Sequence, residues 1–276
     1  GSAGVHNLKS AERFDPRLKK WEALPDMQEH RRGAAAATIG GCLYVSGGEG
    51  GADGEYVLSS TERFNPSVAV WDSLPPMQSH RFGAAAAAVR GHFCVCGGSV
   101  GLDALSCAES FDPASSSWEA LPHMLEGRVG AMGASITGCL YVCGGGQVQR
   151  TLHSVERFHP ELGYWEEGPA LTEGFRFAAS AVVAGRLLVF GGQLCAGRGR
   201  RSAKLLDLEK GGRWLQLQRL LGGSATDAGL ADMVCGLARP LRGDLRTRLC
   251  VLLFVCLVGW LWLVGCGWLW LVGCGW

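Results

Sequence analysis

The chain carries little charge and shows no sequence signature of an enzyme site. Only 18% of its 276 residues are charged, and the formal net charge is +1. Residues 1–192 are net acidic and residues 193–276 net basic, but neither part has the density of Lys and Arg that nucleic-acid binding requires. The sequence has no nucleophile elbow, P-loop, dinucleotide fingerprint or zinc-ligand spacing. We therefore expect neither an enzyme nor a nucleic-acid-binding protein, and we expect no metal and no cofactor.

The chain has no secretory signal peptide at its start, and its 12 cysteines do not suggest a disulfide framework. Because it begins with Gly1, we expect it to be part of a longer protein or the product of an imperfect gene prediction. Cys94-x-Cys96 is a strand alternation rather than a Cys-x-x-Cys metal motif. Free cysteines behave as small hydrophobes, and five fall on or beside bulky apolar runs: Cys42, Cys94, Cys96, Cys139 and Cys143. We expect free thiols in a reducing cytoplasm.

What the sequence has in abundance is internal repetition. A block of motifs recurs every 47–50 residues, and a period near 50 with this content is typical of propellers or solenoids. Its Gly-Gly pairs are Gly47, Gly48, Gly97, Gly98, Gly144, Gly145, Gly191 and Gly192. Its tryptophans are Trp21, Trp71, Trp118 and Trp165, and Trp214 follows. A Glu-x-Phe-x-Pro motif begins at Glu12, Glu62, Glu109 and Glu156.

Each block divides into four extended runs, which we call a to d in chain order. In one copy they are residues 34–39, 42–45, 61–65 and 70–74, and Gly40 and Gly41 form the turn between runs a and b. The runs are apolar on both faces, as expected for a sheet packed between two other sheets. A propeller blade is such a sheet.

The recurring residue types suit a blade. Alanines fit the innermost strand, where blades converge and space is short. The Gly-Gly pairs remove side chains where the backbone turns close to a neighbour. A tryptophan on run d has a large apolar ring that can pack between blades. We interpret all of these positions as structural, since repeats need them in order to stack.

The blocks resemble kelch repeats. Glu-Arg-Phe-Asp-Pro, Trp-x-x-Leu-Pro-x-Met and His-Arg-x-Gly are similar to the BTB-kelch (kelch-like) adaptor proteins in particular. The resemblance covers about residues 8–217 and implies an all-β, kelch-type β-propeller. We expect whole repeats at 31–74, 81–121, 128–169 and 176–217. Residues 8–25 supply only runs c and d of a further blade, so the propeller is expected to be incomplete. Residues 1–7 are expected to be disordered.

Recurrent arginines are the candidate partner-binding residues. They stand just before run a in each block: Arg31, Arg81, Arg128 and Arg176. Equivalent positions in successive blades point to one rim of the channel, where guanidinium groups would bind carboxylates or phosphates. The resemblance implies that such arginines contact acidic peptide motifs. The alternative is that they pair with Glu62, Glu109 and Glu156 or with loop carbonyls, and both possibilities remain open.

The resemblance implies a protein-interaction module that binds through rim loops and arginines. In kelch-like proteins this commonly serves substrate recognition for a cullin-based ubiquitin ligase, recruited by separate domains. An actin-associated kelch scaffold is the alternative. A kelch-type copper oxidase resembling galactose oxidase is less favoured, because Tyr44 and Tyr141 occupy one repeat position and are expected in the core. Tyr56 lies on a loop without a histidine nearby in the sequence.

Residues 218–276 do not continue the repeat. Residues 249–276 contain no charged side chain, and an octamer repeats perfectly within a Trp-, Gly- and Leu-rich stretch at 259–276. Length and apolarity, with arginines upstream, predict a membrane anchor. The perfect repetition is also typical of translated repetitive DNA. We therefore expect a cytoplasmic protein, and one anchored at a membrane by its C-terminal segment is the alternative.

Overall fold

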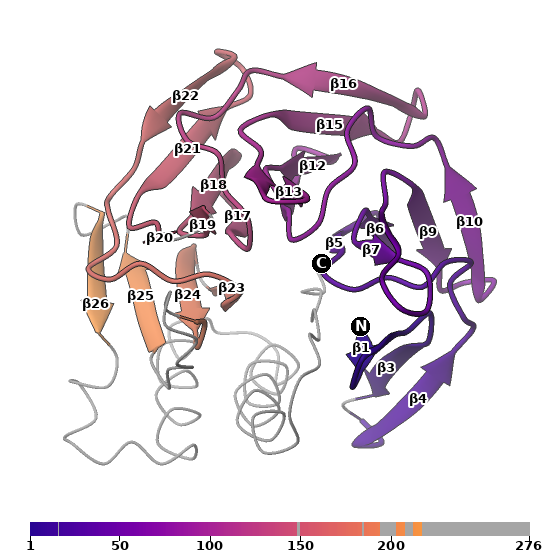
Figure 1. Ribbon diagram of the computed structural model, residues 1–276. Helices are drawn as coiled ribbons and strands as arrows, with labels where there is room; N and C mark the ends of the chain where they lie inside the picture. Colours follow the sequence, from indigo (N-terminus) through magenta and orange to yellow (C-terminus); the bar gives the residue numbers. More distant parts are fainter. Residues whose placement is uncertain (16, 148–149, 184, 194–202, 208–211, 217–276) are drawn as a thin grey trace.

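The computed structural model describes residues 1–15, 17–147, 150–183, 185–193, 203–207 and 212–216 (Figure 1). The described strands form four antiparallel four-stranded sheets, a two-stranded sheet and four short hairpins. The fold is an all-β propeller, as the repeat predicts. The non-kelch tail at 218–276 and the basic loop before run c of the last repeat lie outside the described residues.

Each four-stranded sheet is one blade, and we number the blades in chain order. Blade 1 consists of β5 (Ala35–Ile39), β6 (Cys42–Ser46), β9 (Thr61–Asn65) and β10 (Val70–Leu74). Blade 2 consists of β11 (Ala85–Val89), β12 (His92–Cys96), β15 (Ala108–Asp112) and β16 (Ser117–Leu121). Blade 3 consists of β17 (Met132–Ile136), β18 (Cys139–Cys143), β21 (Val155–His159) and β22 (Tyr164–Glu167). Blade 4 consists of β23 (Ala179–Val183), β24 (Arg186–Phe190), β25 (Ala203–Asp207) and β26 (Arg213–Gln216).

The strands β3 (Ala11–Asp15) and β4 (Lys20–Leu24) pair with each other and form the predicted half-blade. Among the described residues no further strand joins them. In Figure 1 the half-blade and blades 1 to 4 follow one another along an arc, with the first strand of each blade near the centre and the last at the outside. The expected incomplete set of blades therefore matches the described part of the chain.

The innermost strands pack too closely for large side chains. Ala35 and Ala85 are each only 1% exposed. On β17, a Cβ atom added to Gly133 would lie 2.5 Å from the carbonyl oxygen of Ala86 in the neighbouring blade. Strands β5, β11, β17 and β23 contact one another in that order. The predicted role of the small residues is confirmed.

Short hairpins connect the second and third strands of blades 1 to 3; we call the connections between these two strands the b–c loops. They are β7 (Glu49–Gly50) with β8 (Tyr56–Val57), β13 (Ser99–Val100) with β14 (Asp103–Ala104), and β19 (Gly146–Gln147) with β20 (Arg150–Thr151). The half-blade has its own, β1 (Ser2–Ala3) with β2 (His6–Asn7).

The prediction that residues 1–7 are disordered is therefore wrong. Gly1 takes the place that Gly48 has in blade 1. The amide of Leu8 donates to the carbonyl of Gly1 at 2.8 Å, as the amide of Leu58 donates to Gly48 at 2.8 Å. These backbone bonds order the segment although its side chains are small and polar.

The tryptophans fasten each blade to the one before it. Trp71 on β10 donates its indole N–H to the carbonyl of Pro25, which follows the last strand of the half-blade, at 2.8 Å. Trp118, Trp165 and Trp214 bond in the same way, each at 2.8 Å, to Pro75, Pro122 and Pro169. The predicted position of the indole between blades is confirmed, and each tie includes a hydrogen bond.

The Gly-Gly pairs meet the connector of the next blade. Gly47 and Gly48 have φ of 67° and 96°, in the left-handed region that favours glycine. The amide of Gly48 donates to the carbonyl of Arg81 at 2.7 Å. A Cβ atom on Gly47 would lie 2.5 Å from that same oxygen. The pair is therefore required by both conformation and space.

Among the described residues, no helix has the length and apolarity needed to cross a membrane. The hydrophobic segment at 249–276 lies outside them.

Candidate functional site

Three of the four candidate arginines are buried. Arg31, Arg81 and Arg128 are exposed by 1%, 1% and 0%. Each pairs with the glutamate on the third strand of its own blade: Arg31 with Glu62, Arg81 with Glu109 and Arg128 with Glu156.

Arg128 illustrates the arrangement. Its Nε donates to Glu156 Oε1 at 3.0 Å, and its Nη1 donates to the carbonyls of Gly144 at 2.8 Å and Ser154 at 3.0 Å. Its Nη2 donates to Ser154 Oγ at 2.8 Å. The carboxylate of Glu156 also accepts the backbone amides of Leu125 and Glu126, at 2.6 and 3.1 Å. The pair thus joins the interblade connector to the blade that follows it.

The sequence left open whether these arginines contact a partner or pair with glutamates and carbonyls of the propeller, and this geometry is the second alternative. A guanidinium group that is almost fully buried, with its donors bonded to its own blade, has no surface to offer a partner. The structure therefore contradicts the predicted partner contact for Arg31, Arg81 and Arg128.

In blade 4 the prediction chose the wrong residue, because Arg176 lies one position after the residue that is equivalent to Arg128. The position equivalent to Arg128 is Phe175, since the amide of Gly145 donates to the carbonyl of Phe175 as that of Gly98 donates to Arg128. The glutamate position holds Lys204, which pairs with Val189 as Glu156 pairs with Val142.

Phe175 and Lys204 form a different buried pair. The Lys204 ammonium lies 5.3 Å from the centroid of the Phe175 ring and donates to Thr172 Oγ1 at 3.0 Å. Glu173 Oε2 is 3.8 Å away. A cation–π contact and an ion pair thus replace the Arg–Glu pair.

Arg176 occupies the next position, which is half-exposed in every blade. Its equivalents are Arg32, Phe82 and Val129, and we call these four residues the mouth ring. Each forms a backbone bridge to a b–c loop: Arg32 to Glu49, Phe82 to Ser99, Val129 to Gly146 and Arg176 to Gln193. The mouth ring therefore lies beside the b–c loops.

The residue after each member links neighbouring blades close to the centre of the arc. The amide of Gly83 donates to Gly33 at 2.9 Å, that of Gly130 to Gly83 at 2.7 Å, and that of Phe177 to Gly130 at 2.7 Å. Phe177 holds φ of 55° where the other blades have glycine. A continuous chain of backbone bonds thus fixes the spacing of the mouth ring.

The mouth ring combines aromatic and cationic groups. The rings of Phe82 and Phe177 lie 6.2 Å apart, and the Arg32 guanidinium lies 5.7 Å from the centroid of Phe82. Arg32 also pairs with Glu49 at 3.0 Å. Arg176 makes no side-chain hydrogen bond or ion pair with any residue that the structure describes.

Sequence reasoning missed Phe82, Val129 and Arg32 as candidates. It selected the position that repeats, which is the structural one. The signal lay one residue further along, where the residue type changes between Arg, Phe and Val while the arginine before it recurs in three copies. A position that stacking does not restrict is free to carry specificity.

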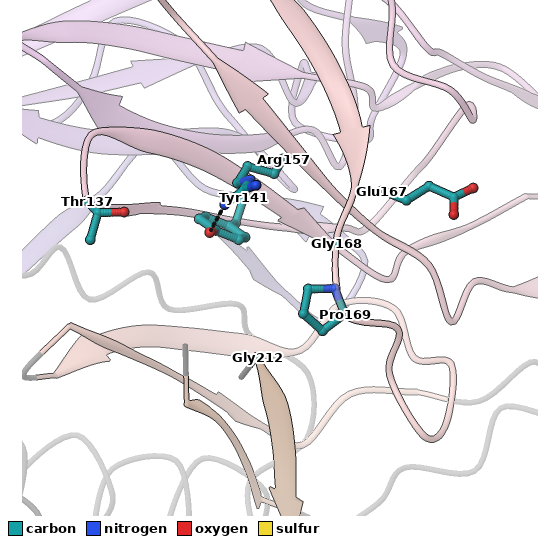
Figure 2. A pocket seen from close by; sticks show the side chains of 7 residues that line it. All are labelled: Thr137, Tyr141, Arg157, Glu167, Gly168, Pro169 and Gly212. Carbon is teal, nitrogen blue, oxygen red and sulfur yellow. Dashed lines mark hydrogen bonds between the residues drawn. The ribbon is translucent and has the colours of Figure 1, made fainter. Parts of the chain in front are cut away.

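A cleft of about 350 Å³ lies between blades 3 and 4 (Figure 2). Thr137, Tyr141, Arg157, Glu167, Gly168, Pro169 and Gly212 line it. Figure 2 shows Arg157 directed at Tyr141, whose hydroxyl accepts a hydrogen bond from Nη1 at 3.3 Å. Tyr141 is 2% exposed and Tyr44 is 3% exposed, so the prediction that both belong to the core is confirmed. Among the described residues no three His, Cys, Asp or Glu side chains gather as a metal site.

The four-stranded blades, with a chain of backbone bonds along their inner side, define a β-propeller. The family model of the Kelch motif matches residues 30–78, 80–125 and 127–172. A comparison with curated proteins gave no match. The chain belongs to the kelch-repeat family, whose propellers are typically protein-binding modules.

Proposed function

We propose that this propeller binds a protein partner on the face formed by the mouth ring and the b–c loops. The observation that carries the proposal is the contrast between neighbouring positions. The arginines before the mouth ring are buried and bonded, whereas the mouth ring itself is half-exposed and varies between arginine, phenylalanine and valine. A rigid scaffold that presents variable side chains beside loops suits recognition.

The chemistry of this face favours a segment with both an acidic and an apolar side chain. Arg176 supplies a guanidinium, which binds carboxylates in a bidentate manner. Phe82 and Phe177 supply an apolar surface beside it. On the neighbouring loop tips Tyr56 is 55% exposed and Leu102 is 78% exposed, which extends the apolar character outward.

We further propose that the module serves substrate recognition for a cullin-based ubiquitin ligase in the cytoplasm, without catalytic activity of its own. The motifs Glu-Arg-Phe-Asp-Pro and His-Arg-x-Gly, which are similar to kelch-like adaptor proteins, support this role. Cosedimentation with actin filaments would instead identify an actin-associated scaffold.

Peptide selection tests the binding face. Peptides selected from a random phage library on the immobilised protein are measured by fluorescence polarisation against wild type, Phe82→Ala and Arg176→Ala. We expect each variant to weaken binding about tenfold, which corresponds to about 1.4 kcal/mol. Arg13→Ala, on the half-blade, is the matched control and should leave Kd unchanged. Equal affinities for all four proteins would refute the mouth ring as the binding site.

A further inference from the structure

A cysteine, a histidine and a glutamate form a connected cluster on blade 3. Cys139 Sγ lies 3.6 Å from His159 Nδ1, and His159 Nε2 lies 2.8 Å from Glu166 Oε1. The three residues come from three neighbouring strands, β18, β21 and β22. Arg157 also forms an ion pair with Glu166. Neither the kelch fold nor the proposed binding face uses this cluster.

The hydrogen-bond partners set the tautomer of His159. A carboxylate only accepts hydrogen bonds, so the Nε2 of the imidazole carries the proton that Glu166 accepts. The lone pair of Nδ1 then faces the thiol of Cys139 and can take its proton. A nucleophile in contact with a base, and the base held by a carboxylate, is the arrangement that activates a thiol.

Cys139 is one of three described cysteines that are not buried, together with Cys42 and Cys107. Cys139 is half-exposed, whereas Cys94, Cys96 and Cys143 are buried. Burial raises the pKa of the Cys143 thiol to about 12. Cys139 lies against the contact with blade 4, on the same side of β18 as Tyr141, which lines the cleft of Figure 2.

The repeat supplies an internal comparison. Cys42 holds the same position in blade 1 and is also half-exposed. Asn65 stands there in place of His159, and Asp72, which pairs with Arg63 at 2.8 Å, stands in place of Glu166. Blade 2 has His92 at the cysteine position and blade 4 has Arg186. Among the described blades, only blade 3 combines the thiol with an imidazole.

We propose that Cys139 is a reactive thiol that is modified by α,β-unsaturated carbonyl compounds, with His159 as its base. The thiol proton moves to His159 Nδ1, and a sulfur electron pair forms a bond to the β-carbon. The π electrons of the C=C bond move toward the carbonyl to give an enolate. The α-carbon then takes the proton from the imidazolium, which leaves a thioether and a neutral histidine. No oxidant or reductant takes part.

The surroundings suit such an adduct. The neighbouring cleft of about 350 Å³ has room for a small molecule. Because the cysteine packs beside the contact between blades 3 and 4, modification would add bulk next to an interblade contact and so connect chemical exposure to the stability of the propeller.

Competition between Cys139 and Cys42 tests the proposal. The full chain is treated briefly with N-ethylmaleimide, and mass spectrometry of the peptides gives the modification rate of each cysteine. We expect Cys139 to react at least about tenfold faster than Cys42, since a positioned base contributes that much or more. His159→Asn, which restores the residue found in blade 1, should lower the rate of Cys139 to that of Cys42.

The converse variant keeps the test decisive if His159→Asn fails to fold. Asn65→His places an imidazole between Cys42 and Asp72, and it should raise the rate of Cys42 about tenfold. Cys94, Cys96 and Cys143 should stay unmodified and so report an intact fold. Equal rates for Cys139 and Cys42 in the wild type, or no gain in Asn65→His, would overturn the proposal.

Discussion

Replacement of Arg128 by methionine tests the structural role of the buried arginines. The change keeps a long apolar stem and removes the guanidinium. It deletes the donors to Glu156, Ser154 and the carbonyl of Gly144, while the carboxylate stays buried at 1% exposure. Two backbone amides remain to Glu156, but its positive partner is gone.

The expected loss in the free energy of unfolding is about 3–5 kcal/mol, because breaking a buried ion pair leaves an uncompensated charge. This is a large share of the roughly 5–15 kcal/mol that stabilises a typical domain. Urea unfolding followed by tryptophan fluorescence measures the loss as a shift of the midpoint at constant slope. A loss below about 1 kcal/mol would refute the assignment of Arg128 as a buried structural cation.

Blade 4 provides the matching rescue. Arg128→Phe alone should be as damaging as Arg128→Met. Leu125→Thr and Glu156→Lys, added to Arg128→Phe, copy the arrangement of Phe175 and Lys204 into blade 3. We expect the triple variant to recover about 2 kcal/mol relative to Arg128→Phe, an interaction energy typical of contacting residues. A triple variant no more stable than the single one would show that the two buried pairs are not interchangeable.

Three further changes have expected outcomes. Ala69 holds φ of 54° at the turn position where Gly163 stands in blade 3, so Ala69→Gly should raise the stability by about 0.5–1 kcal/mol in thermal unfolding; an unchanged or lower Tm would contradict this. Trp165→Phe removes the indole hydrogen bond to the preceding connector and should cost about 1 kcal/mol in the same assay, so an unaltered Tm would argue against the tie. The backbone amide of Ala114 lowers the pKa of Asp112, so the stability that this carboxylate contributes is present above its unfolded pKa and is lost as pH falls through its folded pKa. Asp112→Asn should flatten the fall of Tm below about pH 4, and an identical pH profile would exclude this contribution.

The sequence predicted the blades well because the residues that pack between blades recur with the period of the repeat. Runs 61–65 and 70–74 match β9 and β10 at both ends, and the other runs of blade 1 differ by one residue. Trp71 and the Gly47–Gly48 pair occupy the positions that the repeat implied. Stacking requires the same volume and conformation in every copy, so the requirement is visible as repetition.

The candidate site could not be predicted in the same way. Whether Arg81 faces a partner or Glu109 depends on which side of the connector its side chain lies, and the spacing alone does not contain that information. In blade 4 the buried Arg–Glu pair is replaced by Phe175 and Lys204. Arg176, the next residue, was therefore wrongly predicted to be the equivalent of Arg128. Residues 1–7 appeared featureless because the backbone bonds that hold them leave no pattern of side chains in the sequence.

The tryptophan ties have a consequence for how such a chain can change in length. Each joins two residues 43–46 positions apart, on successive blades. A duplication or deletion of one whole repeat therefore re-creates the same joint on both sides, without any new residue. The buried pair that includes Arg128 lies instead within one repeat and its own connector. The number of blades and the buried pair inside each blade can thus change independently of each other. The replacement of the Arg–Glu pair by Phe175 and Lys204 is a change inside one blade.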